Sequence, residues 1–172
     1  MKKLLQKIKN KFLQNKIDNS IVLLSSKIRE FTKPVRKVGF IVDSELEIDY
    51  LDIVRLTENI GLKEKDLKVV SYSKTVFNDP FYKMRVSDES INFFGNIRSA
   101  DANEFISYDY DLLINYFGKN KILSLISSKS NAKFRVGFEK SNPKLNDIIF
   151  KNIYNNFGKF SNQLVKYLKI LK

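Results

Sequence analysis

The residues best placed to do chemistry follow the most apolar run of the chain, VGFIV at residues 38–42. Asp43, Ser44 and Glu45 come directly after it, and two carboxylates this close together can hold Mg²⁺ or act as a base. An acid after a strand also commonly caps the helix that follows, because the N-terminal end of a helix is positive. Capping is the interpretation that we favour, and ligand binding by Asp43 and Ser44 is the alternative.

A second polar group follows the apolar run at residues 111–116. Asn115, Gly118 and Lys119 offer an amide, an unhindered backbone N–H and an ammonium group, which together suit a phosphate. Ligands collect at the carboxyl ends of parallel strands, where both polar groups would then lie. The chain has no GxGxxG or GxxxxGK[ST] segment, and single glycines are usually turn residues, so the indication is weak.

Composition narrows the chemistry further. The 172 residues include no histidine and no cysteine, which removes the commonest general base, thiolate nucleophiles and most zinc ligands. We therefore assign no catalytic residue, metal ion or cofactor, and we favour a non-catalytic protein over an enzyme. The lack of cysteine fits a reducing compartment, and neither a signal peptide nor an apolar run of membrane-spanning length is visible. We predict a cytoplasmic protein.

The first 37 residues carry most of the charge. They hold eleven basic and two acidic side chains, a net +9 of the formal +12, and the remainder is nearly neutral. Apolar residues recur there at steps of three and four, which predicts an amphipathic helix over residues 2–30 that Pro34 ends, with residues 18–20 as a potential break. We expect six lysines on its polar half and five apolar residues on the other: Lys2, Lys3, Lys7, Lys9, Lys11 and Lys16 against Leu4, Leu5, Ile8, Phe12 and Ile17.

Three interpretations of this basic arm, residues 1–34, stay open. Its apolar half docks on the rest of the protein, or its lysines contact the phosphates of RNA, or it lies on an anionic membrane surface. RNA is favoured over membrane, because Asn10, Gln14 and Asn15 can hydrogen-bond and the apolar stripe is narrow and lacks tryptophan. We predict a module that contacts RNA or the ribosome through this helix. Pairing of two copies through the apolar stripe, giving a homo-oligomer, is a further alternative.

Aromatic residues interleaved with Lys83, Arg85 and Arg98 form another candidate surface, since bases stack on aromatic rings. Most phenylalanines in such a chain belong to the core, and we favour that interpretation. The aromatic candidates are Phe77, Phe81, Tyr82, Phe93, Phe94, Phe117, Phe157 and Phe160.

The elements that would position these groups alternate between strand and helix after residue 37. Strand patterns of period two and helix patterns of period 3.6 follow one another at the spacing of parallel βαβ units. We expect strands at 38–43, 67–72, 91–94, 111–116, 133–138 and, less distinctly, 147–150, and helices at 48–60, 101–107, 120–128 and 157–171. This predicts an α/β fold, with a single open, mostly parallel Rossmann-like sheet of about five strands in residues 35–172, preceded by the basic arm.

Several of these pieces resemble a family of uncharacterised short proteins of Bacteroidota. They are the basic start, VGFIVD (38–43), YDLLINYF (110–117), SNAKFRVGF (130–138), KLNDIIF (144–150) and YLKIL (167–171). The resemblance implies a shared fold and carries no assigned activity.

A local resemblance covers residues 109–138. DYDLLINYFGKN, a helix and NAKFRVGF are similar to part of the N-terminal domain of heptosyltransferase-type glycosyltransferases. The resemblance implies shared fold ancestry without the activity. The alternative function is the binding of a nucleotide or sugar phosphate at the strand ends, with Asp43, Asn115 and Lys119 nearby. The first strand lacks the glycine-containing turn of those enzymes, and no second nucleotide-binding domain follows.

Overall fold

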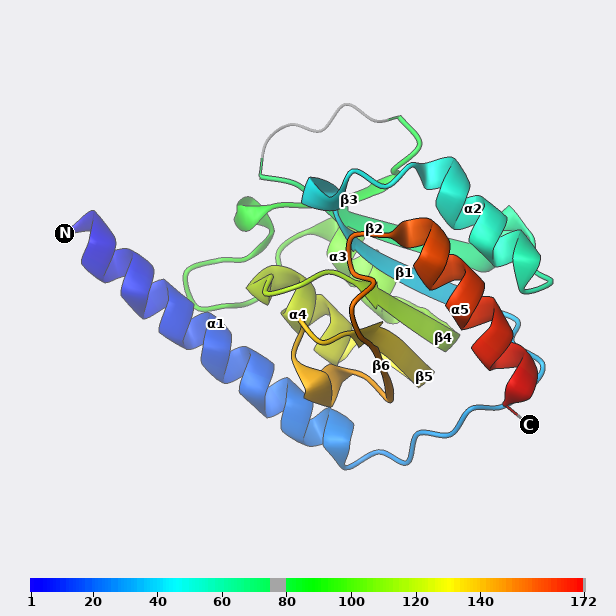
Figure 1. Cartoon of the computed structure of the whole chain (residues 1–172). Helices are drawn as coiled ribbons and strands as arrows, with labels where there is room; N and C mark the ends of the chain where they lie inside the picture. The colour runs from blue at the N-terminus through cyan, green and yellow to red at the C-terminus, as the bar shows by residue number, and fades with distance from the viewer. Residues whose placement is uncertain (75–79, 172) are drawn as a thin grey trace.

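The computed structural model describes residues 1–74 and 80–171, which form one open α/β sheet with helices on both faces (Figure 1). Its six strands are all parallel, in the order β3-β2-β1-β4-β5-β6, which is the order of a doubly wound Rossmann sheet. The predicted fold class is confirmed, with six strands instead of about five. The strands are β1 (Val38–Asp43), β2 (Leu67–Tyr72), β3 (Met84–Val86), β4 (Asp109–Tyr116), β5 (Asn131–Phe138) and β6 (Ile148–Phe150); the helices are α1 (Lys2–Ser25), α2 (Tyr50–Asn59), α3 (Ala100–Ser107), α4 (Lys121–Lys129) and α5 (Phe157–Ile170).

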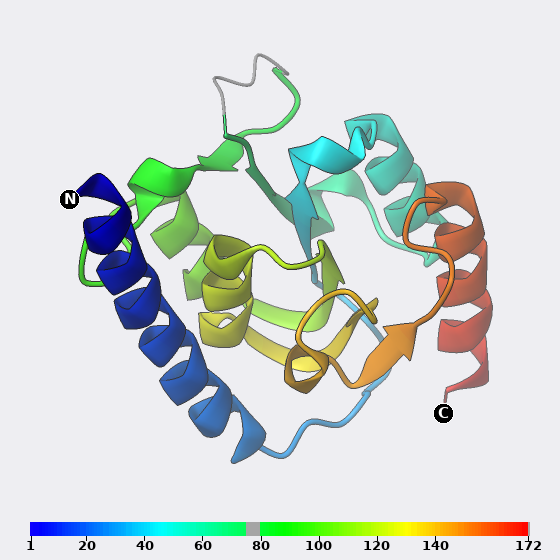
Figure 2. The same cartoon turned by 60° about the vertical axis from the view of Figure 1, so that its left-hand side comes forward.

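Helices divide between the two faces of the sheet. α3 and α4 bury apolar side chains against one face, with α1 packed on the outside of α4, and α2 and α5 cover the other face (Figures 1 and 2). β1 lies between β2 and β4, and all six of its residues are buried, as expected for a central parallel strand. Gly39 in this strand packs closely on β4, because a Cβ there would lie 2.8 Å from the Leu113 side chain and 3.0 Å from the Tyr110 ring, so a larger residue would require these buried side chains to shift.

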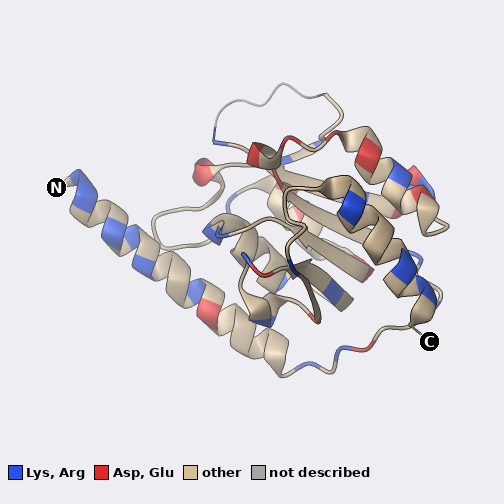
Figure 3. Ribbon diagram, in the orientation of Figure 1, with Lys and Arg blue, Asp and Glu red and all other residues tan. Residues whose placement is uncertain are grey.

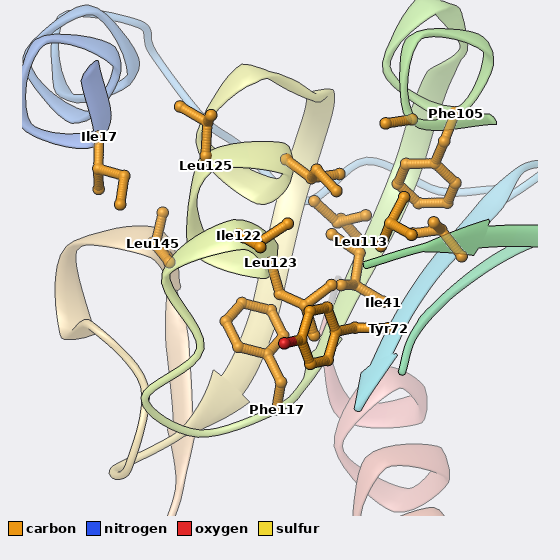
Figure 4. Packing of buried hydrophobic residues seen from close by; sticks show 14 of the residues in the cluster. Ile17, Ile41, Tyr72, Phe105, Leu113, Phe117, Ile122, Leu123, Leu125 and Leu145 are labelled. Atoms are coloured by element: carbon orange, nitrogen blue, oxygen red, sulfur yellow. The ribbon is translucent and has the colours of Figure 1, made fainter. Parts of the chain in front are cut away.

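α1 is one continuous helix through residues 18–20, and it ends at Ser25 instead of near residue 30. Its second half docks on the domain, with Leu13, Ile17, Ile21 and Leu24 each at most 5% exposed. These side chains belong to the same core cluster as the apolar residues of α4, and Ile17 points toward α4 in Figure 4.

The prediction of a single apolar face on α1 is wrong. A helix turns about 100° per residue, so Ile17 lies nearly opposite Leu4, Ile8 and Phe12. Ile17 is buried with the docked residues, whereas Leu4 is 61% exposed and Ile8 and Phe12 are each 38% exposed. α1 therefore has two apolar faces, one covered by the domain and one left in solvent.

The strand predicted at residues 91–94 is also wrong. Ile91 makes only an isolated antiparallel bridge to Ile97, because Asn92 organises a turn between them. The Asn92 Oδ1 accepts the N–H of Phe94 at 2.9 Å and the N–H of Asn96 at 3.0 Å. The edge strand is β3 instead, three residues long and too short to be recognised from its pattern.

Asp111 fastens the chain between α1 and β1 to the sheet. Its Oδ2 accepts the backbone N–H groups of Arg36 at 2.8 Å and Lys37 at 3.1 Å, and its Oδ1 lies 2.7 Å from the Lys133 ammonium group. Burial alone would raise the pKa of Asp111, but Lys133 and the two N–H groups lower it on balance.

A fully buried arginine holds the C-terminal end of α4. The Arg135 guanidinium donates to the carbonyl of Ser127 at 2.7 Å and to the carbonyl of Ser130. Burial, and then repulsion by Arg29, lower the pKa of Arg135 to about 10, partly opposed by Asp147. The position of α4, and hence of its first turn, is set by these bonds.

Candidate ligand cavity and the N-terminal helix

The carboxyl ends of β1, β2 and β4 open into a cavity of about 480 Å³. β1 and β4 are neighbours in the sheet, and the helices that follow them, α2 and α4, lie on opposite faces. Open α/β sheets bind their ligands at this kind of topological switch point, and the volume is in the usual range of small-molecule pockets.

Asp43 lies at the base of this cavity and is only 8% exposed. Its Oδ1 accepts the backbone N–H of Glu45 at 3.1 Å, so it caps the short 3₁₀ helix Ser44–Leu46. Its Oδ2 accepts the Asn120 side-chain N–H at 3.0 Å, and Asn120 in turn caps α4 through the N–H of Leu123. The capping interpretation is confirmed, and the same carboxylate also links β1 to the first turn of α4.

The other two carboxylates of the lining also have partners. Asp88 accepts the Tyr72 hydroxyl at 2.7 Å, and Glu45 forms a 2.8 Å ion pair with Lys74 at the exposed rim. Burial raises the pKa of the Tyr72 phenol, and the hydrogen bond to Asp88 and nearby negative charges raise it further. Tyr72 is therefore a neutral donor at physiological pH.

The segment after β4 forms another side of the cavity with Gly118 and Lys119, as the sequence predicts for the end of a strand. Gly118 faces Tyr154, because a Cβ on this glycine would lie 3.0 Å from the Tyr154 hydroxyl. Burial, together with the negative charges of Asp43 and Glu45, raises the pKa of Tyr154 to about 12.

Two of the predicted site residues are not among those that line the cavity. Ser44 is the half-buried first residue of the 3₁₀ helix. Asn115 is fully buried, with Leu113 and Phe117 as core neighbours along β4. Its side-chain N–H donates to Asn146 Oδ1 at 2.7 Å, and its own Oδ1 has no partner among the described residues.

α1 contributes residues to the same cavity, which the sequence did not predict. Gln6, Lys9 and Asn10 line it, one to two turns before the buried Leu13. These polar residues continue the docked face of the helix toward its N-terminus, so the face that is apolar against α4 becomes polar over the strand ends. The basic arm and the strand ends, predicted as separate sites, meet here through Lys9.

The outer face of the first half of α1 is apolar and exposed. Leu4 and Leu5 are 61% and 48% exposed, and Phe12 meets two exposed aromatics from the turn after Ile91. The rings of Phe93 and Phe94 lie 6.0 Å and 5.6 Å from that of Phe12, measured between centroids. Helical spacing alone would not have found this pair, because it lies more than 80 residues further along the chain.

Lysines recur along the first half of α1, as the blue bands in Figure 3 show, and helical spacing places them on both sides of this apolar face. One row has a spacing of four residues and the other a spacing of seven, so each row follows the helix axis. The rows are Lys3, Lys7 and Lys11 on one side and Lys2, Lys9 and Lys16 on the other. All except the half-buried Lys9 are exposed.

The other aromatic candidates do not gather into one platform. Phe117 and Phe160 are fully buried, Tyr82 is 2% exposed, and Phe81 stacks on Tyr50 in a different part of the surface. Phe157 is half-buried, and Phe77 lies outside the described residues. Among the aromatic candidates that the structure describes, only Phe93 and Phe94 adjoin the basic helix.

Residues 1–74 and 80–171 contain no group of three or more histidine, cysteine, aspartate or glutamate side chains that could hold a metal ion. None of their helices combines the length and the apolar character that crossing a bilayer requires.

Comparison with known families identifies one match. Residues 9–171 match the family model described as a family of unknown function (DUF6913). The chain belongs to this family. The match begins inside α1 and runs to the end of α5, so the docked half of α1 lies within the matched residues. No curated protein and no solved structure matches the chain.

Proposed function

We propose that this protein is a non-catalytic binding module that contacts an anionic surface through the outer face of α1. The observation that carries the proposal is an exposed apolar stripe bordered by two rows of lysines. Leu4, Leu5, Ile8 and Phe12 form the stripe, and Phe94 extends it at 57% exposure. The partner that fits this combination best is an anionic membrane surface, on which the helix would lie flat.

The energetics distinguish a membrane from RNA. Burying an exposed leucine, isoleucine or phenylalanine side chain contributes about 1.5–3 kcal/mol when the burial is complete, and these side chains have roughly half of their area left to bury. Each lysine near an anionic bilayer adds about 1 kcal/mol. RNA would use the lysines but leave Leu4, Leu5 and Ile8 in water, whereas a bilayer takes up both the charge and the apolar area.

Single-stranded RNA or the ribosome is the second candidate, supported by the cluster of Phe12, Phe93 and Phe94. Three partly exposed rings within about 6 Å of one another, beside lysines, resemble a stacking surface for bases. The resemblance to Bacteroidota proteins includes the basic start, and the local resemblance to heptosyltransferase-type enzymes covers residues 109–138. Neither resemblance assigns a partner to this helix.

Flotation of the full-length protein with vesicles tests the proposal. We expect it to float with phosphatidylcholine vesicles that contain phosphatidylglycerol, to stay behind with pure phosphatidylcholine, and to be released by raised salt. Leu4→Gln combined with Ile8→Gln is expected to abolish flotation. The matched control is Ile170→Gln, at a 75% exposed isoleucine on α5.

Binding of a single-stranded RNA by the same variants separates the two candidates. RNA contacts made by lysines would survive Leu4→Gln with Ile8→Gln, so binding to RNA without binding to vesicles would replace the membrane with RNA as the partner. The variants are substitutions, because deleting residues 1–17 would also remove the buried Leu13 and Ile17 and damage the fold.

A further inference from the structure

The cavity at the strand ends does not involve the exposed apolar residues of α1. Some of the charged side chains that line it form ion pairs with other side chains, and others do not. Lys9, Lys119 and Lys121 all line it, and none forms an ion pair with another described residue. They come from three places, the inner face of α1, the segment after β4, and the first turn of α4. Three unpaired ammonium groups around one cavity favour an anion.

The carboxylates of the lining do not offset these lysines directly. Glu45 is paired with Lys74, Asp88 accepts the Tyr72 hydroxyl, and Asp43 accepts N–H groups from Asn120 and Glu45. These partners hold the three carboxylates away from Lys9, Lys119 and Lys121, so no ion pair occupies the three ammonium groups. With Lys74 the lining has four lysines and three carboxylates, a formal charge of +1.

The remaining lining matches the other parts of a phosphorylated metabolite. Gln6 and Asn10 offer amide donors and acceptors from α1, and Tyr154 offers a phenol that burial and nearby negative charges keep protonated. Leu13 and Ile122 supply apolar surface. A cavity of about 480 Å³ is larger than a phosphate ion needs, so the phosphate would be one part of a larger molecule.

We infer that this cavity binds a small molecule that carries a phosphate or diphosphate group, with Lys9, Lys119 and Lys121 around the phosphate and α1 closing one side. Nucleotides and sugar phosphates share this chemistry. The inference does not depend on the proposed function, because it needs none of the exposed apolar residues of α1; Lys9, at the edge between the two faces, is the one residue of the lysine rows that it shares.

Calorimetric titration of the full-length protein tests the inference with four probes: pyrophosphate, ADP, UDP-glucose and glucose 6-phosphate. We expect saturable binding of at least one of them, weakened about tenfold or more by Lys119→Gln and by Lys121→Gln, since a charged hydrogen bond contributes about 1.5–3 kcal/mol. Lys159→Gln on α5, at an exposed lysine that is not part of the cavity lining, is the matched control and is expected to bind as the wild type does. Thermal unfolding of each variant checks that the fold is intact.

Hydrogen exchange supplies a second readout. A bound ligand that touches Lys9 is expected to slow exchange of the backbone N–H groups in the first half of α1, and Lys9→Gln is expected to reduce that protection.

Nucleotide binding without glucose 6-phosphate binding would assign the site to nucleotides, and the reverse would assign it to sugar phosphates. The absence of saturable binding for all four probes at millimolar concentration, or equal weakening by Lys159→Gln, would overturn the inference. Vesicle flotation could succeed in either case, so the two proposals fail separately.

Discussion

Replacing Ile17 with alanine measures how firmly α1 is docked on the domain, on which both proposals depend. The Ile17 side chain is 2% exposed and packs in the core cluster that α1 shares with α4. The substitution removes three carbon atoms, each worth about 0.8 kcal/mol of burial, and leaves a cavity that adds to the loss. The better helix propensity of alanine returns a few tenths of a kcal/mol. We expect the free energy of unfolding to fall by about 2–3 kcal/mol.

The assay is urea unfolding of the full-length protein, monitored by far-ultraviolet circular dichroism. The matched control is Val22→Ala in the same helix, at a residue that is 68% exposed. Its effect should stay within about 0.5 kcal/mol of zero, because the site is solvated and alanine favours the helix. The slope of the free energy against urea should be the same for both variants, since neither changes the surface exposed on unfolding.

An Ile17→Ala loss no larger than that of Val22→Ala would refute the reasoning. It would mean that α1 is detached in solution, so that Lys9 no longer lies at the cavity. In that case Leu13 and Ile17 would join the exposed apolar residues of the helix, and the two-faced description of α1 would fail.

Three further predictions concern the rest of the fold. The pKa values of Tyr116 and Tyr154 in the fold are about 12, raised mainly by burial above the ordinary value of about 10. Their contribution to stability is therefore complete below pH 10 and is lost as the pH rises toward 12, which unfolding followed by tyrosinate absorbance will detect. Gly137→Ala is expected to cost about 1–3 kcal/mol, because the new methyl group would clash with the buried Asn146 side chain. Asp111→Asn should cost about 1–3 kcal/mol at neutral pH in urea unfolding, by weakening the bonds that this carboxylate accepts.

Each of these has an outcome that would contradict it. Ionisation of Tyr116 and Tyr154 with midpoints near pH 10, without unfolding, would show that the two phenols are solvated. A Gly137→Ala variant as stable as the wild type would mean that Asn146 moves aside at no cost. For Asp111, whose pKa is lowered in the fold, the stabilisation is lost as the pH falls below the ordinary value of about 3.9, so the gap to Asp111→Asn must narrow in acid. A gap that is constant with pH would contradict the assigned ion pair.

The local hydrophobic pattern of the sequence correctly predicts the central strands and the helices that follow them. The run VGFIVD is apolar on both faces, which occurs in a central parallel strand, and β1 is that strand. The helices after β1 and β4 follow from their periodicity and from the residues that cap them. The alternation of strand and helix predicts parallel strands but not their order in the sheet. Of the two three-residue edge strands, β6 was predicted at residues 147–150 and β3 was missed.

The alternating pattern of the strand around Asn115 indicates that this side chain is buried, although the sequence analysis predicts it in the ligand site. Asn115 lies between Leu113 and Phe117 in an alternating strand, so its side chain belongs to the same buried face as theirs. Because it is an amide near the end of a strand, it was placed in the ligand site. In the fold its partner is Asn146, 31 residues later in the sequence, which no local pattern indicates.

The sequence by itself determined that the chain begins with a basic, partly apolar helix and continues as a parallel α/β sheet, because charge and periodicity are local properties. Only the tertiary structure decided which side of that helix is buried. Both of its apolar series recur at steps of three and four, and the choice depends on α4, which lies about a hundred residues later and supplies a matching apolar surface only to Leu13, Ile17, Ile21 and Leu24. The same docking leaves Leu4, Ile8 and Phe12 in solvent and carries Lys9 to the strand ends, since a rigid helix that is fixed along one half has its other half placed as well.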